Sequence, residues 1–288
     1  MEATLLPGGR RLHMHHGPID LVLEAWGEAG EVRAAYRQGI AAFDGLLEAL
    51  VAELPLLRAP LMAETPMPQG LVARQMVAAC WPHRARFITP MAAVAGAVAD
   101  HVLAAMIERR RLDKAYVNDG GDIAFHLAPG ERLACGMIAD VRFAAIAGTI
   151  SLTAAMPVRG IATSGAPTKG SGGRSVSLGI ADAVTVLAGS AAVADAAATM
   201  IANAVDLPDH AGIRRVPATS LDPDSDLGAR LVTLAVPALQ GLEIERALRA
   251  GWCAAEVLRA AGLIHGAVLA LQGRYALCGG LGRQLRAA

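Results

Sequence analysis

The N-terminal part of the chain alternates apolar and polar residues, and then changes to helical spacing. Residues 12–35 alternate around Gly27 and Gly30, which predicts a β-hairpin there. Residues 38–53 carry apolar side chains at helical spacing and predict a helix. Four prolines within residues 55–70 indicate an irregular crossover, and residues 71–79 predict a further short helix.

Two stronger helices and several short strands are predicted in the remainder. The first helix runs from Thr89 to about Arg110, with Thr89 as N-cap, Pro90 in the first turn and Arg109 to Arg111 at the end that favours cations. The second spans residues 191–205 and ends before Pro208. Strands are expected at 115–117, 123–127, 133–139, 147–154, 160–163 and 183–187.

This order of elements mixes helices and strands without regular βαβ alternation, which favours an α+β layered fold over a doubly wound one. Residues 217–228 predict a polar loop, and mixed helix and strand patterns come after it. We find no internal repeat, and no linker that divides the sequence. The sequence therefore predicts a single domain over residues 1–288.

Composition narrows the classes of function. The chain is 54% hydrophobic but only 3% aromatic, and its formal net charge is zero. A neutral chain without a basic block lacks the charge expected of a nucleic-acid or membrane-surface binder. Asp100, His101 and Asp195 interrupt the longest apolar runs, and the first residues lack a signal-peptide pattern, so we expect a cytoplasmic protein without a membrane span. The four cysteines form no CxxC pair and predict buried free thiols.

Asp195 and Thr199 are the first candidate site residues. They lie four residues apart, so a helix places both on one face, with Ala198 beside them. A carboxylate and a hydroxyl are hard oxygen ligands that suit Mg²⁺. The same spacing also fits a buried Asp that caps a neighbouring element, with Thr199 bonding back to its own helix.

The segment NDGGDI, residues 118–123, places two glycines between two acids directly after a predicted strand. Gly120 and Gly121 can adopt positive φ and present backbone N–H groups, while Asp119 or Asp122 can accept a hydrogen bond from a ribose or a ring N–H. An ordinary Asp/Gly hairpin turn explains the same residues.

Two glycine-rich segments and a histidine cluster are further candidates. TSG at 163–165 and KGSGGRS at 169–175 form either a phosphate cradle with Lys169 and Arg174 or a mobile surface loop. Strand alternation places His13 and His15 on one face and His16 on the other, as expected of an ordinary, partly exposed strand rather than a metal site.

In order along the chain, these segments resemble the ApbE-like superfamily, and within it an uncharacterised ApbE-like or thiamine-biosynthesis-like branch. The resemblance rests on PMAAVAGAVAD (90–100), NDGGDI (118–123), GIATSG (160–165), SVSLGIADAVTV (175–186) and ADAAATMIAN (194–203). Characterised members of this superfamily are Mg²⁺-dependent FAD:protein FMN transferases, which cleave FAD and attach FMN to a threonine of a target protein.

The resemblance implies an ApbE-like fold, largely an antiparallel sheet with packed helices, and a set of site residues. The metal ligands would be the side chains of Asp195 and Thr199 and the backbone carbonyl of Ala92, with Ala198 at a neighbouring position. The flavin nucleotide would lie against Asn118, Asp119, Gly120, Gly121, Asp122, Thr163, Ser164, Gly165 and Ser177. With so few aromatic residues, the site would depend on backbone groups, glycine turns and the metal rather than on stacking.

The chain departs from the transferase pattern at two places. Ala95 precedes Gly96 where transferases carry Lys or Glu, and SVSLGIAD replaces a His-x-x-Asp-Pro segment, with Asp182 as an approximate counterpart. The sequence therefore predicts either Mg²⁺-dependent FMN transfer from FAD or cleavage of FAD at its pyrophosphate, or a non-catalytic protein that binds a flavin or pterin-type cofactor. A protein acceptor is a partner of the first activity, and small-residue helix faces are compatible with a homodimer.

Overall fold

The computed structural model describes residues 1–138, 146–165, 176–280 and 285–287. The chain folds as two compact units, each built from three segments. Unit 1 comprises Met1–Leu133, Leu152–Ala162 and Ala188–Ala196, and unit 2 comprises Ala134–Ser151, Thr163–Leu187 and Ala197–Ala288. The single-domain organisation expected from the sequence stays a prediction.

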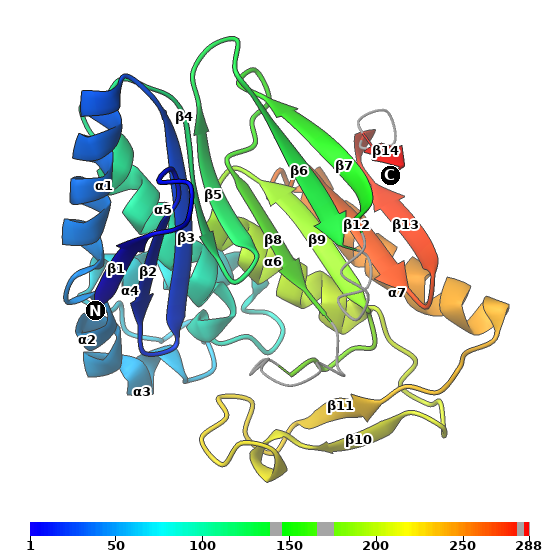
Figure 1. The fold of residues 1–288 in the computed structure, drawn as a ribbon. Coiled ribbons are helices and arrows are strands. Elements are labelled where there is room, and N and C mark those ends of the chain that lie inside the picture. The colour runs from blue at the N-terminus through cyan, green and yellow to red at the C-terminus, as the bar shows by residue number, and fades with distance from the viewer. Residues whose placement is uncertain (139–145, 166–175, 281–284, 288) are drawn as a thin grey trace. The chain divides into compact units, whose positions relative to one another are not determined.

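Unit 1 contains an antiparallel sheet with the strand order β1-β2-β3-β4-β5-β8 (Figure 1). The strands are β1 (Glu2–Leu5), β2 (Leu12–His16), β3 (Ile19–Gly27), β4 (Leu112–Asp119), β5 (Asp122–Leu127) and β8 (Gly160–Ser164), the last of which ends in unit 2. The helices are α1 (Ala29–Phe43), α2 (Leu46–Ala52), α3 (Leu54–Leu57), α4 (Leu71–Cys80), η1 (Trp81–His83), η2 (Pro90–Ala93) and α5 (Val94–Ile107).

Helix α5 forms the hydrophobic centre of unit 1. It packs against β4, β5, α1 and α4, and its Val98 and Val102 are fully buried. The sheet contributes Leu21, Leu23 and Val117, which are also fully buried. The stretch Pro90–Ile107 is long and apolar enough to cross a membrane, with a mean hydropathy of 1.6, but half of it is buried within the protein. Packing in the core of unit 1 therefore accounts for its apolar character.

The N-terminal hairpin is real, but its turn lies earlier than the sequence predicted. Strands β2 and β3 pair around Gly17, which has a φ of 58°. Gly27 ends β3, and α1 begins two residues later, with the Glu28 side chain accepting a hydrogen bond from the Glu31 N–H. The hairpin predicted around Gly27 and Gly30 is thus wrong, because strand alternation ends at Trp26 and the residues after Glu28 form a helix.

Two predicted helices also differ from the structure. The helix expected over 38–53 is the end of α1 followed by α2, because Gly45 adopts a left-handed φ of 74° between them. The helix expected from Thr89 to Arg110 begins as the 3₁₀ turn η2 and ends at Ile107. Thr89 makes no capping hydrogen bond from its side chain, and Arg109 has a φ of 54° beyond the last turn. The three arginines therefore follow the C-terminal end of the helix instead of forming its last turn.

Unit 2 contains three separate groups of antiparallel strands. The elements are β6 (Arg132–Ile138), β7 (Ile146–Thr153), β9 (Ala183–Ala188), α6 (Ala191–Ala204), β10 (Arg214–Pro217), η3 (Ala218–Ser220), β11 (Leu231–Ala235), α7 (Gly241–Ala260), β12 (Gly266–Leu271), β13 (Arg274–Cys278) and β14 (Leu285–Ala287). The strand orders are β9-β12-β13, β14-β7-β6 and β10-β11, and α7 packs on β12 and β13. Helix α6 starts in unit 1 and continues into unit 2.

These elements confirm the predicted α+β class and the largely antiparallel pairing. The alternation of the histidines is also confirmed, because His13 and His15 both contact Asp20 while the His16 ring packs against Phe43. The four cysteines are free, as predicted, but they are not all buried. Cys80 and Cys278 are buried, Cys135 is half-buried and Cys253 is exposed, so the prediction of buried thiols is wrong for Cys253.

Candidate functional site

The NDGGD segment forms the turn between β4 and β5 in unit 1. Asp119 and Asp122 are the last paired residues of the hairpin, and Gly120 and Gly121 form its two-residue loop with φ values of 60° and 115°. Both glycines face open space, since a Cβ added to either would meet no atom within 4 Å. Asn118 accepts a hydrogen bond at its Oδ1 from the Gly121 N–H at 2.8 Å. This geometry provides the open glycine backbone that a ligand would need, and it equally satisfies an ordinary hairpin turn.

The first acid of this turn, Asp119, differs from a solvated carboxylate. Asp119 is only 8% exposed. Its burial, together with the negative charges of Asp122 and Asp20, raises the pKa of the Asp119 carboxyl to about 7, against a hydrogen bond with the backbone of Asp20 that lowers it. Near neutral pH this group is therefore close to its midpoint between the protonated and ionised forms.

Asp195 lies in the second turn of α6, within unit 1, and caps another helix. Its Oδ2 accepts a hydrogen bond from the Gly96 N–H, in the first turn of α5, at 3.1 Å. Burial raises the pKa of Asp195 well above its ordinary value, and the charges of Asp122, Asp119 and Asp100 raise it further. The hydrogen bond from Gly96 opposes this shift. The capping alternative for Asp195 is thus confirmed, and its carboxylate also belongs to a set of repelling acids.

Sequence reasoning missed Asp100 as a member of this set. It treated Asp100 only as an interruption of an apolar run, whereas the structure places its carboxylate at the first residues of α6. The available signal was an acid within a helix of otherwise small apolar residues, a position where a carboxylate needs a specific partner. We call Asp100, Asp119, Asp122 and Asp195 the carboxylate cluster.

The other predicted metal-site residues lie on the same two chain segments. Ala92 is in η2, directly before α5, and its N–H donates to the Thr89 carbonyl at 3.1 Å. Ala198 is fully buried, and Thr199 is half-buried one turn after Asp195 on α6. Metal ligation by Ala92 and Thr199 stays a prediction.

The donor atoms around Asp195 suit a hard cation. Within the described residues, no three His, Cys, Asp or Glu side chains are arranged to enclose a metal ion. Mg²⁺ does not require such a cage, because it commonly uses one or two carboxylates together with water and substrate phosphates. The negative charges that raise the pKa values of Asp195 and Asp119 are the observation that fits a cation, since a positive charge nearby would offset them.

The remaining predicted flavin-site residues belong to unit 2. Thr163 is exposed at the end of β8, and its Oγ1 lies 2.9 Å from Oγ1 of Thr185 on β9. Ser164 is half-buried. Gly165 has a φ of 122°, and a Cβ there would lie 3.0 Å from the Ala181 carbonyl oxygen. Most of the loop after Gly165, including Lys169 and Arg174 of the predicted phosphate cradle, lies outside the described residues.

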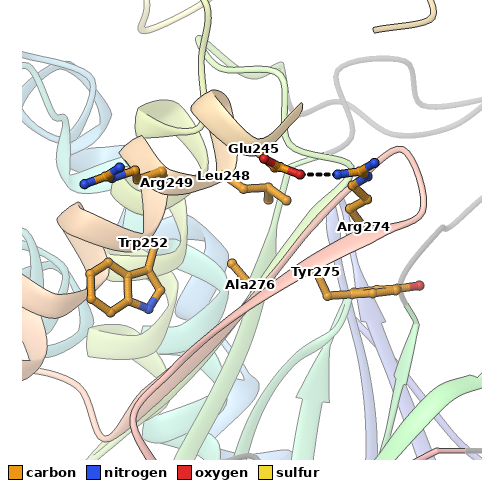
Figure 2. A pocket seen from close by; sticks show the side chains of 7 residues that line it. All are labelled: Glu245, Leu248, Arg249, Trp252, Arg274, Tyr275 and Ala276. Carbon is orange, nitrogen blue, oxygen red and sulfur yellow. Dashed lines mark hydrogen bonds and ion pairs between the residues drawn. The ribbon is translucent and has the colours of Figure 1, made fainter. Parts of the chain in front are cut away.

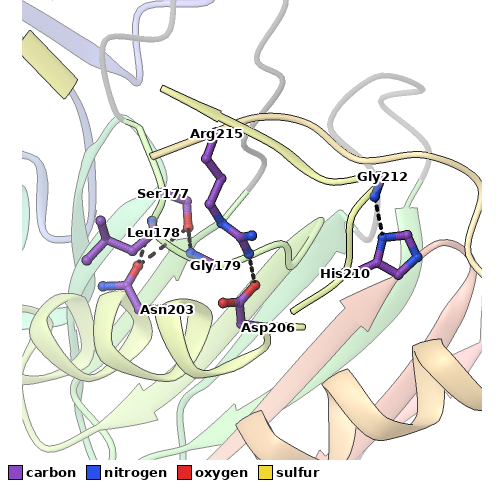
Figure 3. Close-up of polar contacts among 8 residues, drawn as sticks. All are labelled: Ser177, Leu178, Gly179, Asn203, Asp206, His210, Gly212 and Arg215. Atoms are coloured by element: carbon purple, nitrogen blue, oxygen red, sulfur yellow. Dashed lines mark hydrogen bonds and ion pairs between the residues drawn. The ribbon is translucent and has the colours of Figure 1, made fainter. Parts of the chain in front are cut away.

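Ser177 belongs to a network of hydrogen bonds in unit 2 (Figure 3). Asn203 of α6 accepts at its Oδ1 from the Leu178 N–H at 3.1 Å and from the Ser177 hydroxyl at 3.5 Å. The Ser177 Oγ in turn accepts from the Gly179 N–H at 3.2 Å. We call Ser177, Leu178, Gly179 and Asn203 the amide network. Its hydrogen bonds hold the loop before β9 against α6, so Ser177 has a structural role whether or not it contacts a nucleotide.

Unit 2 also carries a shallow groove between α7 and β13 (Figure 2). Its lining residues are Glu245, Leu248, Arg249, Trp252, Arg274, Tyr275 and Ala276. Arg274 forms an ion pair with Glu245 at 2.5 Å, and the Trp252 indole N–H donates to the Leu277 carbonyl at 3.0 Å. None of the residues predicted from the sequence lies in this groove, so it carries no support for the nucleotide site.

Comparison with known proteins gives a family match over most of the chain. The family model described as AbpE bacteria matches residues 3–277. A UPF0280 protein of Methanothrix thermoacetophila is 38% identical over 127 residues, which cover 41% of this chain and 46% of that protein. A UPF0280 protein of Methanosphaerula palustris is 35% identical over 161 residues, or 55% of this chain and 63% of that protein. The chain thus spans about half the length of the curated relatives it matches.

One solved structure shares the fold along almost the whole chain. It is a variant of the flavin transferase ApbE from Vibrio cholerae, with a TM-score of 0.52 and 11% sequence identity, covering 98% of this chain and 99% of that chain. At this level of identity the likeness shows the fold alone. The predicted ApbE-like fold is therefore confirmed.

Proposed function

The chain belongs to the AbpE bacteria family, and from this membership we propose that it binds a flavin nucleotide and cleaves FAD at its pyrophosphate with the help of Mg²⁺. In the hydrolytic reaction, water attacks one phosphorus, a P–O bond of the pyrophosphate breaks, and FMN and AMP leave. In the transfer reaction, a threonine hydroxyl of an acceptor protein replaces the water, and FMN remains attached to that threonine. AMP is released in both cases.

The observation that carries this proposal is the carboxylate cluster around Asp195. Four acids placed so that burial and repulsion raise the pKa of Asp195 are a costly arrangement for a purely structural core. When bound, Mg²⁺ would neutralise negative charge that develops on the pyrophosphate. We propose that Asp195, Thr199 and the Ala92 carbonyl hold it, and that the cytoplasm is where the protein works.

The chain's own residues would supply orientation. The Gly96 N–H fixes one oxygen of Asp195, which leaves the other oxygen for the cation. Gly120 and Gly121 would allow a nucleotide to approach the backbone closely, because no atom covers them. The polar groups of unit 1 proposed to contact the flavin nucleotide are Asn118, Asp119 and Asp122. The contacts expected from the resemblance at Thr163, Ser164, Gly165 and Ser177 stay predictions.

A second function is favoured by two positions that depart from the transferases. Ala95 supplies no charge before Gly96, and Asp182, the approximate counterpart of the transferase acid, accepts a hydrogen bond from the Gln272 N–H at 2.5 Å. These residues would suit a protein that holds a flavin or pterin-type cofactor without cleaving it.

The test is incubation of the full chain with FAD and MgCl₂, with AMP measured by chromatography and flavin binding by fluorescence. We expect AMP release by the wild-type protein and a fall of roughly 100-fold or more in Asp195→Asn. Asp113→Asn, which changes an exposed acid of the same unit, is the matched control and should retain the activity.

The three outcomes separate the two functions. AMP release that depends on Asp195 supports the enzyme, and flavin binding without AMP supports the cofactor-binding protein. A wild-type chain that neither binds flavin nor releases AMP contradicts both.

A further inference from the structure

Helices α5 and α6 exchange carboxylate caps at their N-termini. Asp195 of α6 accepts from the Gly96 N–H of α5 at 3.1 Å. In return, Asp100 of α5 accepts from the Ala191 N–H at 3.0 Å and from the Ala192 N–H at 2.9 Å, using one oxygen for each. Caps usually come from the residue that precedes the helix. Here each of the two helices receives a carboxylate from the other.

The backbone at the start of α6 is in direct contact with α5 at Gly96 and with β8 at Gly160. A Cβ added to Gly96 would lie 2.3 Å from the Ala191 carbonyl oxygen, and a Cβ on Gly160 would lie 2.0 Å from the Ser190 carbonyl carbon. Neither distance is tolerated by real atoms, so glycine is required at both positions. Backbone contact and exchanged caps together fix where the first turn of α6 begins relative to α5.

The two carboxylates are used differently. Both oxygens of Asp100 accept hydrogen bonds from α6, so this side chain is occupied on both sides. For Asp195, the Gly96 N–H is the single hydrogen-bond donor within the described part of the chain, and it bonds to Oδ2. The Oδ1 atom of Asp195 is therefore the oxygen that this arrangement leaves for a ligand.

We propose that Asp100 is a positioning residue for Asp195: by holding the first turn of α6 on α5, it presents the second oxygen of Asp195 to a divalent cation. This inference rests on the proposed function, because it takes Asp195 as a cation ligand. The hydrogen bonds of the Asp100 carboxylate, among the residues that the structure describes, are with the α6 backbone and the Ser190 side chain. Partners that orient a metal ligand typically change metal affinity by about 10–100-fold when they are removed.

The test measures Mn²⁺ binding to the full chain by electron paramagnetic resonance, with Mg²⁺ as competitor. In Asp100→Asn, one acceptor oxygen becomes an NH₂ group that cannot accept from an α6 N–H. We expect the Kd for Mn²⁺ to rise about 10–100-fold in Asp100→Asn and binding to be lost in Asp195→Asn.

Glu28→Gln is the matched control. Glu28 caps α1 in the same unit through its own side chain, so this variant alters a helix cap without touching α5 or α6. Its Mn²⁺ affinity should equal that of the wild type. If Asp100 serves only to stabilise the fold, Asp100→Asn and Glu28→Gln should both lower the free energy of unfolding, and both variants should keep the wild-type affinity for Mn²⁺.

A second measurement covers the case in which Asp100→Asn does not fold. In the wild-type chain, Mg²⁺ should slow amide hydrogen exchange at Ala191 and Ala192 as well as at Gly96, because the cation locks both caps. If Mn²⁺ binds and depends on Asp195, but Asp100→Asn binds it normally or these amides do not respond, the positioning role is overturned while the proposed function stands. If the wild type binds no Mn²⁺, the metal site and the positioning role both fail.

Discussion

The carboxylate cluster of unit 1 and the amide network of unit 2 are both built from polar residues in glycine-containing motifs, yet their electrostatics are opposite. In the amide network, the Oδ1 of Asn203 and the Oγ of Ser177 accept the backbone N–H groups of Leu178 and Gly179, and no group carries a charge. In the carboxylate cluster, burial and like charges raise the pKa values of Asp119 and Asp195.

The difference shows which polar residues stabilise the fold and which oppose it. A neutral network whose donors meet acceptors adds stability and needs no ligand. Acids whose pKa values are raised by burial and by neighbouring charges, as at Asp119 and Asp195, oppose folding once they ionise, and such groups gather at functional sites more often than elsewhere. Three of the four acids in the cluster were candidate site residues from the sequence. The contrast therefore makes these three acids the first candidates to test.

The largest loss of stability should come from substitutions at the two glycines whose backbone packs against α6, one in each region. A Cβ on Gly96 would lie 2.3 Å from the Ala191 carbonyl oxygen, and a Cβ on Gly179 would lie 2.1 Å from the Ala202 carbonyl oxygen. We expect Gly96→Ala and Gly179→Ala each to lower the free energy of unfolding by roughly 4 kcal/mol or more, because backbone must move. Urea denaturation checks this, and a loss below about 1 kcal/mol would show that the contacts are looser than the structure has them.

The pH dependence of stability should distinguish the two regions next. The Asp119 carboxyl has a pKa of about 7 in the folded chain against an ordinary value of 3.8, so the folded state binds this proton more tightly than the unfolded state. The contribution of Asp119 is therefore most favourable below pH 4 and declines as the pH rises to about 7, by on the order of 4 kcal/mol. Asp119→Asn should stabilise the chain at pH 8 without divalent cations and change little at pH 4.

Urea denaturation at the two pH values measures this effect. The amide network provides the comparison, since it contains no titrating group and a change in it should alter stability equally at both pH values. A stability gain from Asp119→Asn that is the same at pH 4 and pH 8 would contradict the raised pKa.

A smaller effect is expected from the amide network itself. Asn203→Ala removes the acceptor of the Leu178 N–H and should lower the free energy of unfolding by about 1–2 kcal/mol. Ser177→Ala should cost about 1 kcal/mol, because the Gly179 N–H loses its acceptor. Neither change should alter Mn²⁺ affinity. A drop in that affinity would show that the network supports the cation site and would weaken the contrast between the two regions.

Local sequence signals predicted the strongly periodic elements and failed where the chain changes direction. The β4–β5 hairpin was predicted because strand alternation on both sides agrees with the turn residues between the two strands. Most of α6 was predicted from its helical spacing. The sequence predicted the hairpin turn at Gly27 and Gly30, whereas the structure has it at Gly17. Gly27 ends a strand and Gly30 lies inside α1, and the helical spacing of the residues after Gly30 is the signal that separates the two cases.

The candidate site was predictable residue by residue but not as an arrangement. Asp195 and the NDGGD acids were selected from spacing, and the structure couples their charges. Asp100 could not be selected, because its role depends on two α6 amides that are 91 and 92 residues away in the sequence. Contacts at such separation leave no periodic signal in a single sequence, so long-range capping appears only in the fold.

The smallest change in stability should come from the β4–β5 turn. A variant there also tests whether NDGGD is only a hairpin turn or contacts a nucleotide. Gly120 has a φ of 60° and open space around it, so Gly120→Ala costs only the left-handed conformation, about 1 kcal/mol. Gly189→Ala is the control: it also faces open space but has no positive φ, so its stability should change by less than about 0.5 kcal/mol. If the turn serves only the hairpin, FAD affinity measured by fluorescence should be the same in both variants. If the nucleotide lies against the turn, the new methyl group should weaken FAD binding in Gly120→Ala. The comparison is made under conditions in which both variants are fully folded.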